Sequence, residues 1–312
     1  MCFFSVVIPL YNKEKFFART LQSVVDQNYS NFEVIVVDDG STDSSPTIIK
    51  GFDDSRIKLL HQINSGVSSA RNNGILNSKG KFVVFLDADD YWCSNHLSTL
   101  YKMIHNFQNH SIFCTNYKLS FSHNASKLAR FSNVSLKGKK TFEVDNFFKL
   151  NLLNSIICTP TSCIKRELLL QYKMYDTKLL TSEDTDLWIR LTTENKILFI
   201  NTYTVVVNRR SENSLSKKLN PDIKIKFLQK HSNISNADTY SKIFMDKIRY
   251  TVYLEYRLLG KNEQANLILN KINYSNLNWK QKLVILCNVT VLRTLFKIKN
   301  KLNYFGIWLK FH

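Results

Sequence analysis

The first half of the chain alternates between short apolar runs, typical of strands, and longer segments with apolar residues at helical spacing. Strands are predicted where β-branched and aromatic residues run together, at residues 4–10, 32–39, 57–60, 82–86 and 111–115. Helices are predicted between them, at about residues 14–27, 43–52, 67–77 and 95–107. This order predicts an α/β fold, with a single mixed or mostly parallel, Rossmann-like sheet flanked by helices.

Chemically distinctive residues follow three of these predicted strands. They are Pro9 to Asn12, Asp38-Asp39-Gly40, and Asp87 to Asp90. Because the carboxyl ends of parallel strands meet at one edge of a sheet, we expect these residues to share a cleft. No G-x-G-x-x-G motif follows the first strand and no G-x-x-x-x-G-K-[ST] motif occurs, so neither dinucleotide binding nor a P-loop is predicted.

The segment FLDADDYW, residues 85–92, places three carboxylates directly after a buried strand. Grouped carboxylates repel one another and raise each other's pKa, so we expect a cation, such as a divalent metal, among them. The alternative is structural, since Asp90 or Ser94 could cap a helix that begins near Asn95. Trp92 could stack on a sugar or pack in the core.

The composition is that of a globular protein with an uneven charge. The chain has 312 residues, 44% hydrophobic and 22% charged, and a net charge of +18. Residues 1–208 hold 23 basic and 19 acidic side chains, whereas residues 209–312 hold 20 and 6. This asymmetry indicates an anionic partner surface, and the alternative is a merely solvated basic tail.

The last third is predicted to be helical, with basic residues between apolar ones in residues 246–259 and 282–302. Such helices can lie on an anionic membrane surface or pack their apolar side against the rest of the protein. Nucleic acid is not expected as a partner, because no recognition motif and no regular series of stacking aromatic residues occurs.

Nothing in the sequence predicts a membrane span or an export signal. The longest apolar candidate, from Leu283, is ten residues long, well below the ~20 that a bilayer requires. The start of the chain lacks a basic segment and a cleavage site, so a cytoplasmic protein is expected, either free or peripheral on the inner face of the membrane. The six cysteines are scattered, which disfavours a zinc site or a disulfide framework.

Five segments in this order resemble the family 2 glycosyltransferases of the GT-A fold. They are SVVIPLYNKEKFFARTLQSVVDQ, FEVIVVDDGSTD, SGVSSARNNGI, FLDADDYW and SEDTDLWIRL. The resemblance covers about residues 3–216. It implies a catalytic domain at residues 1–216 that binds a nucleotide sugar, followed by a basic helical extension at residues 217–312.

The resemblance also implies roles for individual residues on the donor side. Nucleotide binding is implied for Pro9, Tyr11, Glu14, Asp39, Arg71, Asp87 and Asp89. Asp89 is the implied direct ligand of Mn²⁺ or Mg²⁺, ions that favour hard oxygen ligands. Family members often have a His where this chain has Ser211, and Arg209 or Arg210 could contact the diphosphate instead.

On the acceptor side, the resemblance places the general base at Asp184 and an acceptor or sugar contact at Glu183. The alternative is that Ser182, Glu183 and Asp184 only cap a helix. One base and no enzyme nucleophile imply a single displacement with inversion.

The implied enzyme transfers a hexosyl or N-acetylhexosaminyl group from a nucleotide sugar, a UDP-sugar being expected, to a saccharide or lipid-linked saccharide in cell-surface polysaccharide synthesis. The alternative, motivated by Ser211, is a catalytically degenerate sugar-nucleotide-binding or assembly protein.

Overall fold

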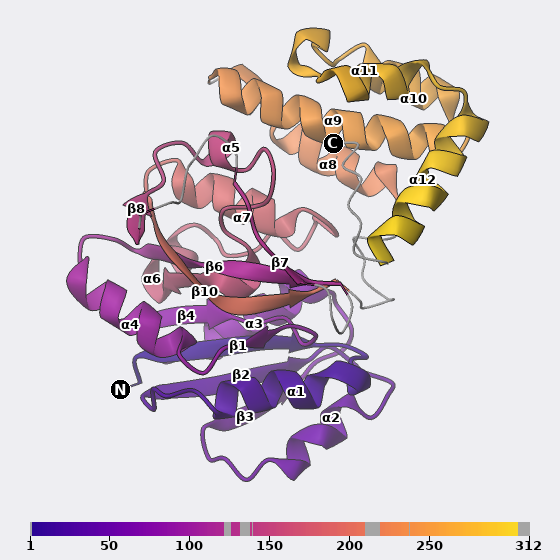
Figure 1. Cartoon of the computed structure of the whole chain (residues 1–312). Helices are drawn as coiled ribbons and strands as arrows, with labels where there is room; N and C mark the ends of the chain where they lie inside the picture. The colour runs from indigo at the N-terminus through magenta and orange to yellow at the C-terminus, as the bar shows by residue number, and fades with distance from the viewer. Residues whose placement is uncertain are drawn as a thin grey trace.

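The strands form one mixed sheet that helices flank (Figure 1). This computed structural model describes residues 2–121, 126–131, 138, 140–209, 219–236 and 238–304. The strand order is β3-β2-β1-β4-β9-β6-β10-β5, with β7 against β6 and β8 against β10. The strands are β1 (Phe4–Leu10), β2 (Phe32–Asp38), β3 (Ile57–His61), β4 (Phe82–Phe85), β5 (Tyr91–Trp92), β6 (Ile112–Ser120), β7 (Ser126–Leu128), β8 (Thr141–Glu143), β9 (Ser162–Lys165) and β10 (Ile197–Asn208).

The first four strands are parallel, as the alternation of strands and helices predicts. Val6 pairs with Val34 of β2 and with Val84 of β4, and all three side chains are buried. The antiparallel strand β9 then lies between β4 and β6. The predicted mixed, mostly parallel sheet is therefore confirmed.

The helices that connect the strands largely match the predicted ones. They are α1 (Glu14–Val25), α2 (Ser45–Ile48), α3 (Val67–Asn77), α4 (His96–Asn106), α5 (Phe147–Leu150), α6 (Arg166–Gln171) and α7 (Glu183–Thr192). The helix expected over residues 43–52 is shorter, because a 3₁₀ turn at Ile49–Gly51 follows α2. Its β-branched residues and the terminal glycine are poor helix formers, which accounts for the short helix.

Helix α3 approaches the sheet very closely at Gly74. A Cβ atom at this position would lie 2.3 Å from Cγ1 of Val7 in β1. The glycine therefore lets the helix backbone pack directly on the central strand. Arg71 is one turn earlier on the same helix, so this contact also sets the position of its guanidinium group.

Five further helices follow the sheet and lie together on one side of it (Figure 1). They are α8 (Pro221–Lys230), α9 (Thr239–Leu258), α10 (Asn262–Leu269), α11 (Trp279–Leu286) and α12 (Val289–Tyr304). The stretch 282–302, expected to be helical, contains the end of one helix and the start of the next, because Cys287 is extended and Asn288 accepts a hydrogen bond from the Val291 amide at 2.9 Å.

Helix α9 packs on the sheet-bearing part of the chain, one of the two alternatives for the basic helices. Phe244 of α9 contacts Phe147 and Phe148 of α5, with ring centroids 6.2 and 5.5 Å apart. The apolar core continues from the sheet into these helices. The predicted domain boundary after residue 216 lies outside the described residues. No helix in the described ranges is both long and apolar enough to cross a bilayer.

A buried ion cluster joins α7 to the end of α8. The fully buried Asp186 accepts hydrogen bonds from Arg190 at 2.9 Å, and it lies 2.7 Å from Nζ of Lys230 and 2.9 Å from Nε2 of His231. Burial alone would raise the pKa of Asp186. The contacts with His231, Lys230 and Arg190 outweigh burial and hold the pKa well below its usual range.

This lowered pKa predicts acid-sensitive stability. A depressed pKa stabilises the fold above the unfolded-state value of about 4, and the contribution is lost as pH falls towards the folded-state value. We expect Asp186→Asn to lower the free energy of unfolding at pH 7 by about 3–5 kcal/mol, because it leaves buried cations without their partner. The deficit relative to wild type should shrink below about pH 4 in urea titrations at pH 7, 5 and 3.5.

Glu167→Gln is the matched control. Glu167 is 80% exposed and pairs with Lys165 at 3.0 Å, so its loss should change stability by no more than about 0.5 kcal/mol at any of these pH values. A constant deficit for Asp186→Asn from pH 7 to 3.5 would contradict the assignment of acid sensitivity to this carboxylate.

Candidate active site

The three strand ends that are followed by candidate site residues lie at one edge of the sheet. Leu10 at the end of β1 pairs with Asp38 at the end of β2, and the Asp39 amide donates to the Leu10 carbonyl at 2.8 Å. The Leu86 amide donates to the Val7 carbonyl at 3.1 Å, so the segment that carries Asp87 starts beside β1. The expected convergence of the strand ends is thus present in the structure.

Protein cations lie against the first two carboxylates that follow β4. Asp87 accepts a hydrogen bond from Arg71 at 2.8 Å, and Asp89 pairs with Nζ of Lys13 at 2.5 Å. Lys13 follows β1 and Arg71 lies on α3, so each cation comes from a different part of the chain. The like charges are thereby compensated by protein side chains. The divalent metal that the sequence leads us to expect among them stays a prediction.

The third carboxylate, Asp90, has a structural partner. It is 3% exposed and accepts a hydrogen bond from the Asn208 amide at 2.7 Å. Burial, followed by the charges of Asp87 and Asp89, raises its pKa well above the ordinary value, and Arg209 acts in the opposite direction. Asp90 therefore anchors the end of β10 to the strand-end loop, in addition to its place in the charged group.

Arg71 also connects this loop to the start of α7. Its second guanidinium nitrogen donates to Glu183 at 2.9 Å, and the group lies 5.1 Å from the centre of the Tyr175 ring. Burial alone would lower the pKa of Arg71, but Asp87 and the other nearby groups raise it overall. The guanidinium group, only 4% exposed, is thus a fixed charged link between Asp87 and Glu183.

The turn into α7 is strained where it presents the two acidic residues. Ser182, the residue before the helix, has φ of 60°, a left-handed conformation that costs a non-glycine residue about 1–2 kcal/mol. Burial and the adjacent Asp184 raise the pKa of Glu183. Asp184 is half-buried, and its Oδ1 accepts the Thr185 amide at 2.6 Å. Glu183 is paired with Arg71, whereas the hydrogen bonds of the Asp184 side chain within the described residues are those with Thr185.

Asp39 organises the loop that follows β3. Its Oδ1 accepts hydrogen bonds from Gln62 at 2.7 Å and from the Ser65 amide at 2.8 Å, and its Oδ2 accepts the Gly66 amide at 2.9 Å. At 3% exposure, the carboxylate is almost fully covered. Asp39 therefore holds this loop in place at the edge of the sheet where the strands end.

The residues after β1 differ in their surroundings. Tyr11 is 46% exposed, so a ring face is open to solvent at the strand end. Pro9 lies beyond Val7, the last residue of β1 that pairs with β4, and its missing N–H therefore costs no hydrogen bond there. Glu14 is exposed and accepts the Ser44 amide at 3.1 Å, a contact that fastens the start of α1 to the loop before α2.

Trp92 is placed differently from the sugar contact that the sequence suggests. Its indole is 3% exposed, donates to the Pro160 carbonyl at 2.9 Å and lies 4.3 Å from the His96 ring. A ring with both its faces and its N–H engaged in the core offers no surface to a ligand, so the packing alternative holds.

Arg209 follows β10, and its amide donates to the Ser120 carbonyl at 2.8 Å. Arg210 and Ser211 lie outside the described residues.

Comparison with known proteins identifies the family. The model of "Glycosyl transferase family 2" matches residues 5–172, more than half of the chain. The chain belongs to this family.

Relatives and solved structures agree with the assignment. UDP-Glc:alpha-D-GlcNAc-diphosphoundecaprenol beta-1,3-glucosyltransferase WfgD of Escherichia coli is 30% identical over 222 residues, which are 70% of this chain and 82% of WfgD. The chain spans less than a third of the length of several other curated relatives, including GlyA of Streptococcus pneumoniae (15%) and an uncharacterized glycosyltransferase of Rickettsia bellii (29%).

Two structures share the fold. Staphylococcus aureus TarS 1–349, solved with UDP-GlcNAc, has a TM-score of 0.59 at 21% identity, over 86% of this chain and 89% of that one. GalNAc-T7, solved with UDP, GalNAc and Mn²⁺, has a TM-score of 0.58 at 16% identity, over 85% and 51%. The predicted GT-A fold is confirmed.

A metal at this family 2 site would have a limited set of protein ligands. Among the described residues, no three His, Cys, Asp or Glu side chains are grouped so as to hold a metal. Mg²⁺ and Mn²⁺ nevertheless often bind through one or two carboxylates together with substrate phosphates and water. Asp89, whose side chain is 16% exposed, fits that role if Lys13 releases it.

Lys13 is the member of the charged group that the sequence analysis missed. The signal was present, because Lys13 is two residues after Tyr11 at a strand end that faces the carboxylates. Because a divalent metal is expected to neutralise the carboxylates after β4, no lysine is assigned that role from the sequence.

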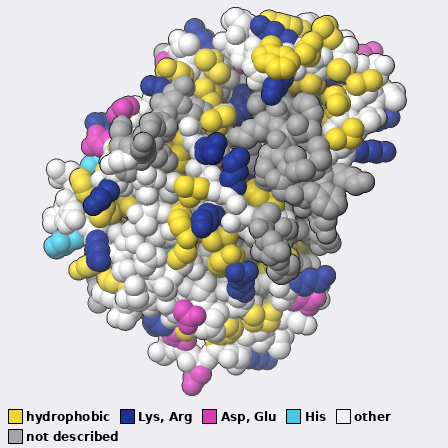
Figure 2. Space-filling view, viewed as in Figure 1, with side chains coloured by type: hydrophobic (Ala, Val, Ile, Leu, Met, Phe, Trp, Pro, Cys, Tyr) yellow, Lys and Arg dark blue, Asp and Glu magenta, His cyan; other side chains and the backbone are white. Residues whose placement is uncertain are grey.

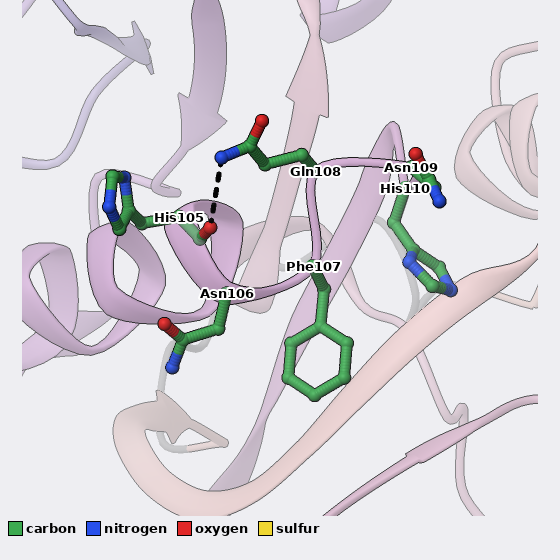
Figure 3. Close-up of a pocket in the computed structure, with 6 residues that line it drawn as sticks. All are labelled: His105, Asn106, Phe107, Gln108, Asn109 and His110. Carbon is green, nitrogen blue, oxygen red and sulfur yellow. Dashed lines mark hydrogen bonds between the residues drawn. The ribbon is translucent and has the colours of Figure 1, made fainter.

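A separate hollow at the opposite end of the sheet has no comparable chemistry. It measures about 350 Å³ and is lined by His105 to His110, between α4 and the amino end of β6 (Figure 3). Gln108 donates to the His105 carbonyl at 3.3 Å, and His110 lies 2.9 Å from Glu143. The side chains in Figure 3 point in different directions, so no shared binding centre results.

Proposed function

We propose that the chain transfers a sugar from a UDP-sugar to a saccharide acceptor, with inversion at the anomeric carbon. The observation that carries this proposal is the Arg71 link, because it holds Asp87 on the donor side 2.8 Å away and Glu183, next to the expected base, 2.9 Å away. Donor and acceptor chemistry thus meet at one edge of the sheet. Family membership and the UDP-Glc donor in the name of WfgD support the choice of donor.

The nucleotide binds beyond the ends of β1 and β2 in this proposal. The exposed ring of Tyr11 packs on uracil, and Pro9 and the loop anchored by Asp39 form the walls. A uracil N–H would share Oδ2 of Asp39 with the Gly66 amide, since each carboxylate oxygen has two lone pairs. Glu14 contributes by holding the loop at Ser44.

The diphosphate lies near Asp87, Asp89 and Arg209. Bound by Asp89, Mn²⁺ or Mg²⁺ would supply Lewis-acid stabilisation of the leaving diphosphate. The guanidinium group of Arg209, with Arg210 beside it in sequence, suits hydrogen bonding to phosphate oxygens.

Asp184 accepts the proton of the attacking acceptor hydroxyl. Glu183 is buried and paired with Arg71, so it cannot turn towards an acceptor without breaking that ion pair. Asp184 has no such constraint from Arg71, and it is half-buried in the first turn of the same helix. Because one base and no enzyme nucleophile are assigned, the reaction is a single displacement.

The acceptor proposed is a lipid-linked saccharide in cell-surface polysaccharide synthesis, and the group transferred is a hexosyl or N-acetylhexosaminyl unit. The name of WfgD, a glucosyltransferase acting on a diphosphoundecaprenol-linked GlcNAc, supports this class. Membership of a transferase family disfavours the alternative of a noncatalytic binding protein.

Transfer assays test this proposal. Purified full-length protein is incubated with UDP-glucose or UDP-GlcNAc, Mn²⁺ and a diphosphoundecaprenol-linked GlcNAc acceptor, and the product is analysed by NMR. We expect a β-linked product, and for Asp184→Asn a fall in kcat of about 10²- to 10⁴-fold through loss of the base.

Calorimetric titration of UDP provides the control. Asp184→Asn should bind UDP as wild type does, because Asp184 is not among the residues assigned to the nucleotide. Retention of full activity by Asp184→Asn would contradict its role as base, and an α-linked product would contradict the single displacement.

The C-terminal helices also offer a surface suited to an anionic membrane. Along α11, Trp279, Leu283 and Leu286 recur at positions i, i+4 and i+7 and are 67%, 54% and 81% exposed. On the opposite side of this helix, Gln281 and Val284 are buried. We call the three exposed side chains the α11 face, and it has no apolar partner within the described residues.

Charge supports a membrane as the occupant. Lys280 and Lys282 flank the α11 face and are exposed, and residues 209–312 hold 20 basic against 6 acidic side chains. Figure 2 shows hydrophobic and basic side chains next to one another over the C-terminal helices at the top of the view. A helix with exposed apolar residues and flanking lysines can bind the boundary between headgroups and acyl chains. Such binding would bring the cleft to a lipid-linked acceptor.

Vesicle flotation tests this surface. We expect wild type to float with vesicles rich in phosphatidylglycerol, and the triple variant Trp279→Ser, Leu283→Ser, Leu286→Ser to lose about 10-fold or more in binding, since apolar burial contributes about 25 cal/mol per Å². Leu76→Ser, an exposed leucine on α3 (57%), is the matched control and should float normally. Equal flotation of the triple variant and wild type would exclude the α11 face.

A further inference from the structure

Lys13 holds the carboxylate that is best placed to bind a metal. Its Nζ lies 2.5 Å from Oδ2 of Asp89, and both side chains are largely covered, at 19% and 16% exposure. At this distance an ammonium group occupies the space beside Oδ2 that a metal ion bound to the same oxygen would need. A partly buried pair is also screened less by salt than a surface pair.

The backbone at Lys13 is fixed by the neighbouring loop. The Lys13 amide donates to the Ser45 hydroxyl at 2.7 Å, and the preceding Asn12 accepts the Thr42 amide at 2.8 Å. Asn12 has φ of 49°, an uncommon conformation that persists only where the surroundings enforce it. The lysine is therefore held in position to reach Asp89 before any ligand arrives.

A cation fixed in this way must affect metal binding. A divalent ion at Asp89 would meet a like charge within a few ångströms, and either the metal is repelled or the ammonium must move. A nucleotide diphosphate changes this balance, because its oxygens attract the ammonium and add ligands for the metal. Arg71 is already paired with Asp87 and Glu183, so Lys13 is the cation that competes with a metal for Asp89.

We propose that Lys13 is an internal counter-cation that suppresses metal binding at Asp89 until the diphosphate of the donor enters. The inference rests on the proposed function, since it assigns the donor a part in opening the metal site. Metal and nucleotide then bind with positive coupling, and the nucleotide-free protein holds the metal weakly.

Electron paramagnetic resonance titration of Mn²⁺ tests the proposal without an activity assay. In nucleotide-free, full-length protein, Lys13→Met should bind Mn²⁺ about tenfold more tightly than wild type, because the competing charge is gone. Lys13→Arg should behave like wild type, and Lys15→Met, which removes an exposed charge two residues further along the chain, should too. Asp89→Asn should abolish the gain when combined with Lys13→Met.

Addition of UDP should narrow the difference between Lys13→Met and wild type, because the diphosphate replaces the carboxylate as partner of the lysine. Equal Mn²⁺ affinity of nucleotide-free wild type and Lys13→Met would overturn the proposal, and so would a failure of the Lys13→Met protein to bind Mn²⁺. Lys13→Gln serves in the same titration if the methionine variant does not fold. If the proposed function is wrong, calorimetry will show no UDP binding. The comparison of Mn²⁺ affinity between nucleotide-free wild type and Lys13→Met does not depend on that result.

Discussion

Compensation of grouped carboxylates by cations from distant parts of the chain is the interaction on which the candidate site depends. Three aspartates follow β4, and left alone they would repel one another and favour protonation. Arg71 from α3 pairs with Asp87, and Lys13, which precedes α1, pairs with Asp89. Asp90 instead accepts a hydrogen bond from the Asn208 amide at the end of β10, and its pKa stays well above the ordinary value. These contacts bring three separate segments to the strand-end loop.

The same compensation connects the site to the rest of the fold through α7. The first turn of this helix carries both Glu183, bound to Arg71, and Asp186, bound to His231 and Lys230. Helix α7 thus lies between the strand-end loop and the C-terminal helices. Asp184 lies between Glu183 and Asp186 in the sequence, so a displacement of those helices would shift Asp184 as well.

Periodicity and strand ends predict much of this arrangement. Continuous apolar runs such as residues 82–86 locate central strands, and the carboxyl-end rule brings Tyr11, Asp39 and Asp87 to one edge before any coordinates are known. The helix over residues 67–77 is predicted to the residue. In the structure Gly66 precedes it and Ser78 is extended after it.

The remaining features depend on contacts between segments far apart in sequence. The pattern of apolar and polar residues along the sequence does not reveal three of these features. They are the burial of Trp92 against Pro160, the break between α11 and α12, and the ion pair between Lys13 and Asp89. The commitment of Glu183 rather than Asp184 to Arg71 likewise follows from side-chain geometry at the turn. Where two neighbouring residues, such as Glu183 and Asp184, are equally good candidates for a role by their spacing in the sequence, these contacts decide which of them takes it.

A double-mutant cycle between Arg71 and Glu183 tests the central claim most directly. The free energy of unfolding would be measured in urea for wild type, Arg71→Met, Glu183→Met and the double variant. If the buried pair holds α7 to the strand-end loop, the single effects will not add, and the coupling energy will be about 1 kcal/mol or more. Additivity within about 0.3 kcal/mol would contradict the account, because it would mean that the two side chains contribute independently.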